Sequence, residues 1–105
     1  MSQMSQIHPI IKKIIDADTD TFVIFFIYEC PYSMKALDFM KDRNLKYKGY
    51  NINSINGGMS RLLQILNQNA SMINFDPKHK TKPIIFVNGQ FVGGFQDLQR
   101  LVDNH

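Results

Sequence analysis

The feature that most constrains the fold is an uninterrupted apolar run, Phe22–Tyr28, which is rich in β-branched and aromatic residues. A strand that is apolar at every position is typical of a sheet covered on both faces. Such a sheet needs helices on both sides, which indicates an α/β protein. With 105 residues, 44% of them hydrophobic and 20% charged, the chain has the size and composition of one globular domain, so we predict a single domain over residues 1–105.

Local patterns predict the other elements. Apolar residues spaced three and four apart predict the helices, and Pro31 suits the first turn of the second one. Asn88-Gly89 predicts a type I′ turn in an antiparallel hairpin, whereas the right-handed β-α-β crossover should make the first two strands parallel. The predicted order is helix 7–15, strand 22–28, helix 31–44, strand 45–52, turn 53–58, helix 59–66, loop 67–80, strands 83–87 and 90–92, and helix 95–102. We expect Phe25, Phe26 and Tyr28 in the core.

Composition excludes several classes of function. The single cysteine, Cys30, excludes an intramolecular disulfide and suits a reducing compartment. No apolar run approaches the ~18 residues of a membrane span, and the first residues lack the apolar region of a signal peptide, so we expect a cytoplasmic protein with no membrane partner. A net charge of +3 without a clustered face does not indicate nucleic-acid binding. His8, His79 and His105 lack metal-ligand spacing, and no metal is expected.

Cys30 stands between the end of the apolar strand and the start of a helix. Unpaired amides and the helix dipole favour an anion at that position, and they can lower the pKa of a cysteine from ~8.5 into the ~3.5–7.5 range. The thiolate is the nucleophilic form. A lone cysteine is otherwise most often a small buried hydrophobic residue, so the surrounding sequence decides between these interpretations.

That surrounding sequence resembles the glutaredoxin family. Cys30-Pro31-Tyr32-Ser33 is similar to the family's CPYC motif with only the first cysteine kept, as in its monothiol members. Thr81-Lys82-Pro83 looks like the family's Thr-Val-Pro loop, and residues 86–98 are similar to its hairpin and closing Gly-Gly helix. The resemblance implies a thioredoxin-like fold with a four-stranded mixed sheet flanked by helices on both faces, and glutathione as the co-substrate.

The resemblance also assigns roles to residues. It implies that Cys30 is the nucleophile, that Pro83 is cis, and that the reaction reduces protein–glutathione mixed disulfides by a monothiol mechanism. The expected partners are glutathione and glutathionylated proteins, and the expected state is a monomer. Asp97 could equally cap the last helix, and the ring of Tyr32 could equally be packing. The residues implied to bind glutathione are Tyr32, Thr81, Lys82, Pro83, Gly94, Phe95, Gln96 and Asp97.

Three features depart from the family pattern. Ser33 replaces the second active-site cysteine, so no intramolecular disulfide can form. Ile27 stands where relatives carry a cation, and Glu29 places a like charge beside the thiolate; both should weaken the site, although Lys35 or Lys82 could compensate. Segment 67–80 looks longer than usual, and the basic cluster within residues 78–82 is either a solvated loop or part of an anion site.

Two alternatives to the enzyme follow from these observations. The first is an iron–sulfur carrier, in which two chains and two glutathiones hold a [2Fe–2S] cluster through Cys30; Pro31 argues against it. The second is a catalytically weak interaction module on the same fold, which Ile27 and Glu29 favour.

Overall fold

A computed structural model describes residues 7–104. The first six residues, which entered the argument against a signal peptide, and His105 lie outside that range. No helix in the described range is long and apolar enough to cross a membrane. The elements are α1 (Pro9–Ile15), β1 (Phe22–Phe26), α2 (Pro31–Asp42), β2 (Tyr47–Asn51), the 3₁₀ turn η2 (Ile52–Ser54), α3 (Gly58–Gln68), α4 (Ala70–Ile73), β3 (Ile84–Val87), β4 (Gln90–Gly93) and α5 (Phe95–Asp103).

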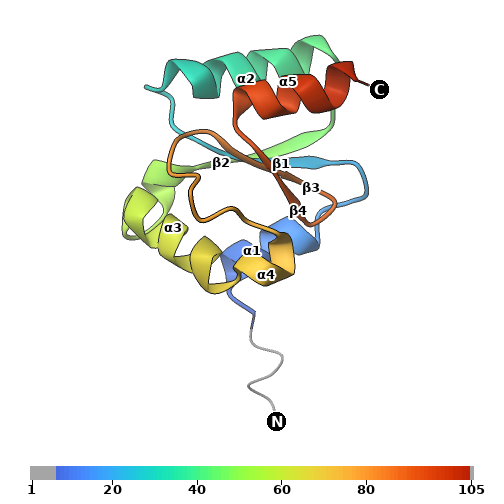
Figure 1. Cartoon of the computed structure of the whole chain (residues 1–105). Coiled ribbons are helices and arrows are strands. Elements are labelled where there is room, and N and C mark those ends of the chain that lie inside the picture. The colour runs from blue at the N-terminus through green and yellow to red at the C-terminus, as the bar shows by residue number, and fades with distance from the viewer. Residues whose placement is uncertain (1–6, 105) are drawn as a thin grey trace.

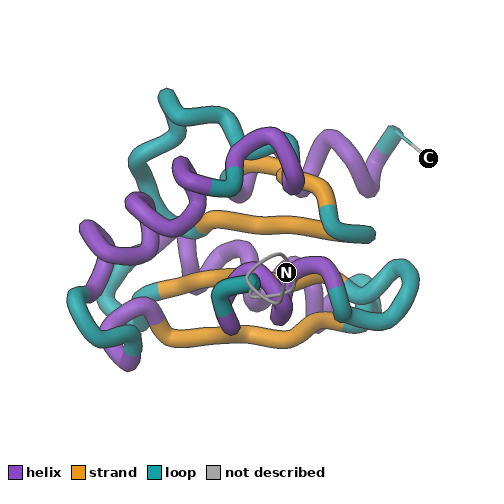
Figure 2. Tube along the Cα trace, turned by 90° about the horizontal axis from the view of Figure 1, so that it is seen from below, coloured by secondary structure: helices purple, strands orange, loops and turns teal. Residues whose placement is uncertain are grey.

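The four strands form one mixed sheet in the order β2-β1-β3-β4, and they lie side by side in Figure 2. β1 and β2 are parallel, with Phe22 opposite Tyr47, while β3 runs antiparallel to both β1 and β4. Asn88 (φ 53°) and Gly89 (φ 75°) close the β3–β4 hairpin with two positive φ angles, as a type I′ turn requires. The predicted α/β class, the four-stranded mixed sheet and both pairing directions are therefore confirmed.

Helices cover both faces of the sheet. Figure 1 shows α2 and α5 on one face and α1, α3 and α4 on the other. Because side chains alternate along a strand, the wholly buried β1 supplies both layers. Val23 and Phe25 belong to the cluster beneath α1 and α3, whereas Phe22, Ile24 and Phe26 belong to the cluster with α2 and α5.

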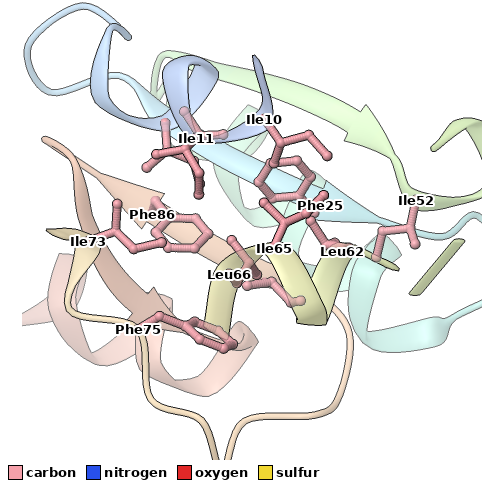
Figure 3. Packing of buried hydrophobic residues seen from close by; sticks show 13 residues of the cluster. Ile10, Ile11, Phe25, Ile52, Leu62, Ile65, Leu66, Ile73, Phe75 and Phe86 are labelled. Atoms are coloured by element: carbon pink, nitrogen blue, oxygen red, sulfur yellow. The ribbon is translucent and has the colours of Figure 1, made fainter. Parts of the chain in front are cut away.

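The larger hydrophobic cluster lies between the sheet and α1, α3 and α4 (Figure 3). Phe25 and Phe86 meet edge to face there, with ring centroids 6.1 Å apart. Phe86 also neighbours Phe75 and Phe91, so an aromatic group links β1, β3, β4 and the segment after α4. This group extends toward the end of the sheet at which Pro83 enters β3.

Two expectations were wrong. Segment 67–80 is not a continuous loop, because α3 continues to Gln68 and α4 follows it. Burial of Ile73 and Phe75 against the core stabilises a single helical turn that has too few residues to show a periodic pattern. Tyr28 is not in the core: it lies beyond the end of β1, it is 62% exposed, and its ring rests edge-on against Phe26 at 5.0 Å.

Candidate active site

Cys30 lies at the junction of β1 and α2, as predicted. A turn connects the end of β1 to the start of α2, and in it the Cys30 amide donates a hydrogen bond to the Ile27 carbonyl at 3.0 Å. Cys30 is the extended N-cap residue of α2, and Pro31 occupies the first turn, where its missing N–H costs nothing. The thiol is partly exposed. It is therefore held at a helix N-terminus and remains accessible to a reactant.

Ser33 supports this turn from inside the molecule. Its side chain is fully buried, and its hydroxyl oxygen accepts a hydrogen bond from the Ile27 amide at 3.2 Å. The hydroxyl is also one of the groups that lower the pKa of the Cys30 thiol. The residue that replaces the family's second cysteine thus lies between the end of β1 and the Cys30 thiol.

The pKa of the Cys30 thiol lies below its ordinary value. Partial burial raises this pKa. Hydrogen bonds from the Ser33 amide and hydroxyl and from the Tyr32 amide, together with the charge of Lys82, lower it by more than burial raises it. Glu29, expected to oppose ionisation, is exposed to solvent, and the thiol pKa is lowered despite it. The expectation that Ile27 and Glu29 weaken the site stays a prediction, and Lys82, one of the two lysines expected to compensate, is among the groups that lower the thiol pKa.

The loop before β3 faces the thiol. The Lys82–Pro83 peptide bond is cis, which confirms the expectation for Pro83. The Cys30 thiol donates to the Lys82 carbonyl oxygen, with sulfur and oxygen 3.7 Å apart. This contact brings together two segments that are 52 residues apart in the sequence and places the Lys82 backbone beside the Cys30 sulfur.

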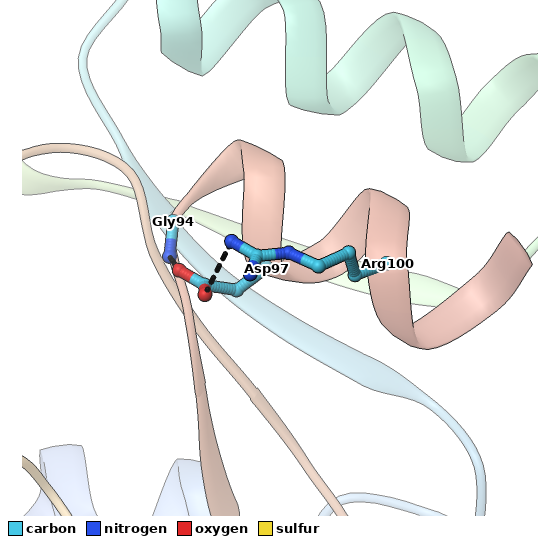
Figure 4. A network of polar contacts seen from close by, with 3 residues as sticks. All are labelled: Gly94, Asp97 and Arg100. Carbon is cyan, nitrogen blue, oxygen red and sulfur yellow. Dashed lines mark hydrogen bonds and ion pairs between the residues drawn. The ribbon is translucent and has the colours of Figure 1, made fainter. Parts of the chain in front are cut away.

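The start of α5 forms a second backbone surface. Gly93 has a φ of 131°, and a Cβ there would collide with the Asp97 carboxylate, so only glycine fits. Gly94 is the N-cap of α5, and its amide donates to Asp97 Oδ2 at 3.0 Å. Arg100 pairs with the other carboxylate oxygen at 3.4 Å (Figure 4). Of the two roles considered for Asp97, the structure shows the cap.

The remaining expected residues lie around these two surfaces. Phe95 and Gln96 follow Gly94 in the first turn of α5, and the side chain of Gln96 is exposed, as is that of Thr81. Tyr32 is 51% exposed, and Lys35 lies over its ring at 5.2 Å. The ring of Tyr32 is thus at the surface beside Cys30 and outside the core.

Sequence reasoning did not single out His79. Its ring lies edge-on against Phe91, with centroids 5.2 Å apart, and its Nε2 is 3.3 Å from the Pro83 carbonyl oxygen. A Cβ on Gly94 would lie 3.6 Å from His79 Cε1. His79 therefore contacts the Pro83 carbonyl and borders the space in front of Gly94. Nothing in its sequence context distinguished it from the neighbouring basic residues.

The fold and the site define a thioredoxin-like thiol oxidoreductase. The chain matches the glutaredoxin family model over residues 22–92. It is 53% identical over 95 residues to a protein of Acanthamoeba polyphaga mimivirus named a probable glutaredoxin, with 90% of each chain covered. It is also 33% identical over 79 residues to mouse mitochondrial glutaredoxin-2, and the matched region covers 75% of this chain and 46% of the mouse protein.

Solved structures agree with this assignment. A dithiolic glutaredoxin from Trypanosoma brucei brucei has 28% identity and a TM-score of 0.67 over 96% of this chain and 90% of that one. An Escherichia coli glutaredoxin has 28% identity and a TM-score of 0.57 over 80% and 94% of the two chains. The chain belongs to the glutaredoxin family of thiol oxidoreductases. Within residues 7–104, no group of three or more His, Cys, Asp or Glu side chains could hold a metal ion.

Proposed function

We propose that the protein is a glutathione-dependent thiol–disulfide oxidoreductase that removes glutathione from protein mixed disulfides by a monothiol route. Cys30 carries the proposal, because its accessible thiol has a lowered pKa and it is the only cysteine in the sequence. A larger thiolate fraction at neutral pH increases the rate of attack on a disulfide. With Ser33 in place of a second thiol, glutathione itself must resolve the intermediate.

The reaction has two exchange steps. First, the Cys30 thiolate attacks the glutathionyl sulfur of the mixed disulfide, so a Cys30–glutathione disulfide forms, the substrate disulfide breaks, and the substrate leaves as a thiolate that takes a proton from water. Second, the thiolate of another glutathione attacks the glutathionyl sulfur held on Cys30. Oxidised glutathione leaves, and the Cys30 thiolate is restored. Two glutathionyl groups leave as one disulfide, so the electrons balance.

The backbone of residues 81–83 is proposed to hold the glutathionyl group. Because the Lys82 carbonyl already meets the Cys30 sulfur, a peptide bound to that sulfur would lie alongside Lys82 and could pair with it as a short strand does. Thr81 and the ring of Tyr32 would border this groove. Glutathione is an anion, and the Lys82 charge that lowers the pKa of the thiol would also attract it.

The first turn of α5 is proposed to bind a carboxylate of glutathione. The amides of Phe95, Gln96 and Asp97 open this helix, and a helix N-terminus favours an anion. The Asp97 carboxylate already accepts from Gly94 and pairs with Arg100. We therefore propose that Asp97 fixes the start of α5, and that Gly94, which has no side chain, leaves room for the glutathione carboxylate to reach the amides of this first turn.

Turnover of a glutathionylated peptide, followed by release of oxidised glutathione, tests the proposal. The wild type should turn over, and after exposure to oxidised glutathione it should gain the mass of one glutathione on Cys30. Cys30→Ser should lose both properties, because no other thiol can replace it. A matched control is Cys30→Ser combined with Ser60→Cys, which places a thiol at an exposed position in the first turn of α3; it should be inactive.

Two results would contradict the proposal. Turnover by Cys30→Ser above background would mean that the reaction does not use this thiol. A folded wild type with a reactive thiol but no turnover would leave the interaction module as the better description.

A further inference from the structure

The loop that precedes β3 turns His79 toward the sheet. Within this loop the Lys78 amide donates to Asp76 Oδ1 at 2.9 Å, and the His79 amide donates to the Asp76 carbonyl at 3.0 Å. These two bonds form a local turn with an aspartate at its start, as such turns favour. His79 is partly buried, whereas Lys78 and Lys80 on either side of it are exposed.

The aromatic core holds the ring of His79 in place. Phe91 contacts His79 edge-on at 5.2 Å, and Phe91 itself packs against Phe75 at 4.9 Å and Phe86 at 5.6 Å. Phe75 and Phe86 are fully or almost fully buried. The imidazole therefore extends a packed aromatic group and has little freedom to move independently of the sheet.

The polar edge of the ring faces a carbonyl at the end of a strand pairing. The β3–β4 ladder ends at the pair Ile85–Gly93, so Pro83 lies beyond it. His79 Nε2 stands 3.3 Å from the Pro83 oxygen. A carbonyl oxygen can only accept a hydrogen bond, so the proton of this contact must be on Nε2. His79 thus supplies a donor where the strand pairing ends.

The same ring lies close to the second backbone surface of the site. A Cβ built on Gly94 would lie 3.6 Å from His79 Cε1 and 3.8 Å from the Pro83 oxygen. The imidazole and the Pro83 carbonyl therefore border the space that a side chain at position 94 would occupy. His79 lies between the segment that faces Cys30 and the segment that opens α5.

We propose that His79 is a positioning residue for substrate binding: through the Nε2–H bond to Pro83, and from its place beside Gly94, it sets the spacing of the two backbone surfaces that receive the glutathionyl group. The proposal rests on the proposed function. It implies an effect on KM more than on kcat, because the Ser33 and Tyr32 hydrogen bonds that lower the thiol pKa come from α2 and do not involve His79.

Two substitutions separate the donor from the ring. His79→Gln keeps an N–H donor of similar reach and loses the aromatic ring, whereas His79→Phe keeps an aromatic ring against Phe91 and loses the donor. A lost hydrogen bond is worth about 0.5–1.5 kcal/mol, so KM for a glutathionylated peptide should rise about 2- to 12-fold in His79→Phe. We expect kcat and the pH midpoint of thiol alkylation to stay unchanged, His79→Gln to retain most of the wild-type KM, and the control Lys78→Gln to match the wild type.

The kinetic results can overturn the proposal in two ways. An unchanged KM in His79→Phe would show that the donor does not position the groove. A KM increase in His79→Gln with no increase in His79→Phe would show that the ring matters and the hydrogen bond does not.

The tautomer supplies an independent measurement on the wild type. Long-range ¹H–¹⁵N correlation spectra of the imidazole should show the proton on Nε2 at pH 8, and a proton on Nδ1 alone would refute the bond to Pro83. A wild type without turnover would refute the proposed function. The tautomer would then still decide whether His79 bonds Pro83.

Discussion

Removal of the Ser33 hydroxyl should affect both the stability of the protein and the ionisation of Cys30. The side chain is fully buried, and its oxygen accepts from the Ile27 amide. Ser33→Ala leaves that amide without its acceptor, which costs about 1–3 kcal/mol. Alanine is a better helix former than serine by about 0.5 kcal/mol, which offsets part of the loss. We expect the free energy of unfolding to fall by about 0.5–2.5 kcal/mol.

Ser60→Ala provides a matched control. Ser33 and Ser60 are each the third residue of a helix, α2 and α3 respectively, but Ser60 is exposed. Urea unfolding of both variants and the wild type measures the difference. Ser60→Ala should stay within about 0.5 kcal/mol of the wild type, while Ser33→Ala should unfold at a clearly lower urea concentration. A loss of 1 kcal/mol lowers the Tm of a domain of this size by roughly 4–8 °C.

The second effect concerns the thiol. The Ser33 hydroxyl is one of the groups that lower the pKa of Cys30, so Ser33→Ala should raise that pKa and slow alkylation by iodoacetamide at neutral pH. The backbone amides of Ser33 and Tyr32 remain, so the pKa should not return fully to that of a free cysteine. Equal unfolding midpoints in the two alanine variants, or an unchanged alkylation midpoint in Ser33→Ala, would refute our account of Ser33.

Three further predictions follow from the site. The pKa of Cys30 is lower in the folded state than in the unfolded state, so the unfolded state binds more protons at pH values between the two. The free energy of unfolding of the wild type, relative to that of Cys30→Ser, should therefore rise with pH through that window, and this contribution should be absent below the folded pKa. A difference that does not change with pH in urea unfolding would contradict this. Lys82→Met should raise the thiol pKa in alkylation titrations, and Lys80→Met should not. Gly93→Ala should destabilise the protein by about 2 kcal/mol more than Gly58→Ala in thermal unfolding, since both have positive φ but only position 93 meets a side chain.

Much of the fold could be predicted from local sequence. The apolar run after Thr21 indicated a strand covered on both faces, and it became the central β1. Pro31 marked the start of α2, and Asn88-Gly89 marked the hairpin turn. These predictions hold because the φ of proline, the positive φ of glycine and the alternation of side chains act over a few neighbouring residues. The motif around Cys30 indicated the candidate nucleophile through its place before a helix and its resemblance to the glutaredoxin motif.

Contacts between distant segments decided the rest. α4 forms because Ile73 is buried against the core, and a four-residue segment is too short for its sequence to predict such burial. Lys82 is among the groups that lower the thiol pKa, and only the packing of the loop before β3 brings it to the thiol. His79 looked like one basic residue among several until Phe91 and Pro83 were placed around it. A sequence determines the conformations that each segment prefers, whereas the distances between segments depend on how the whole core packs.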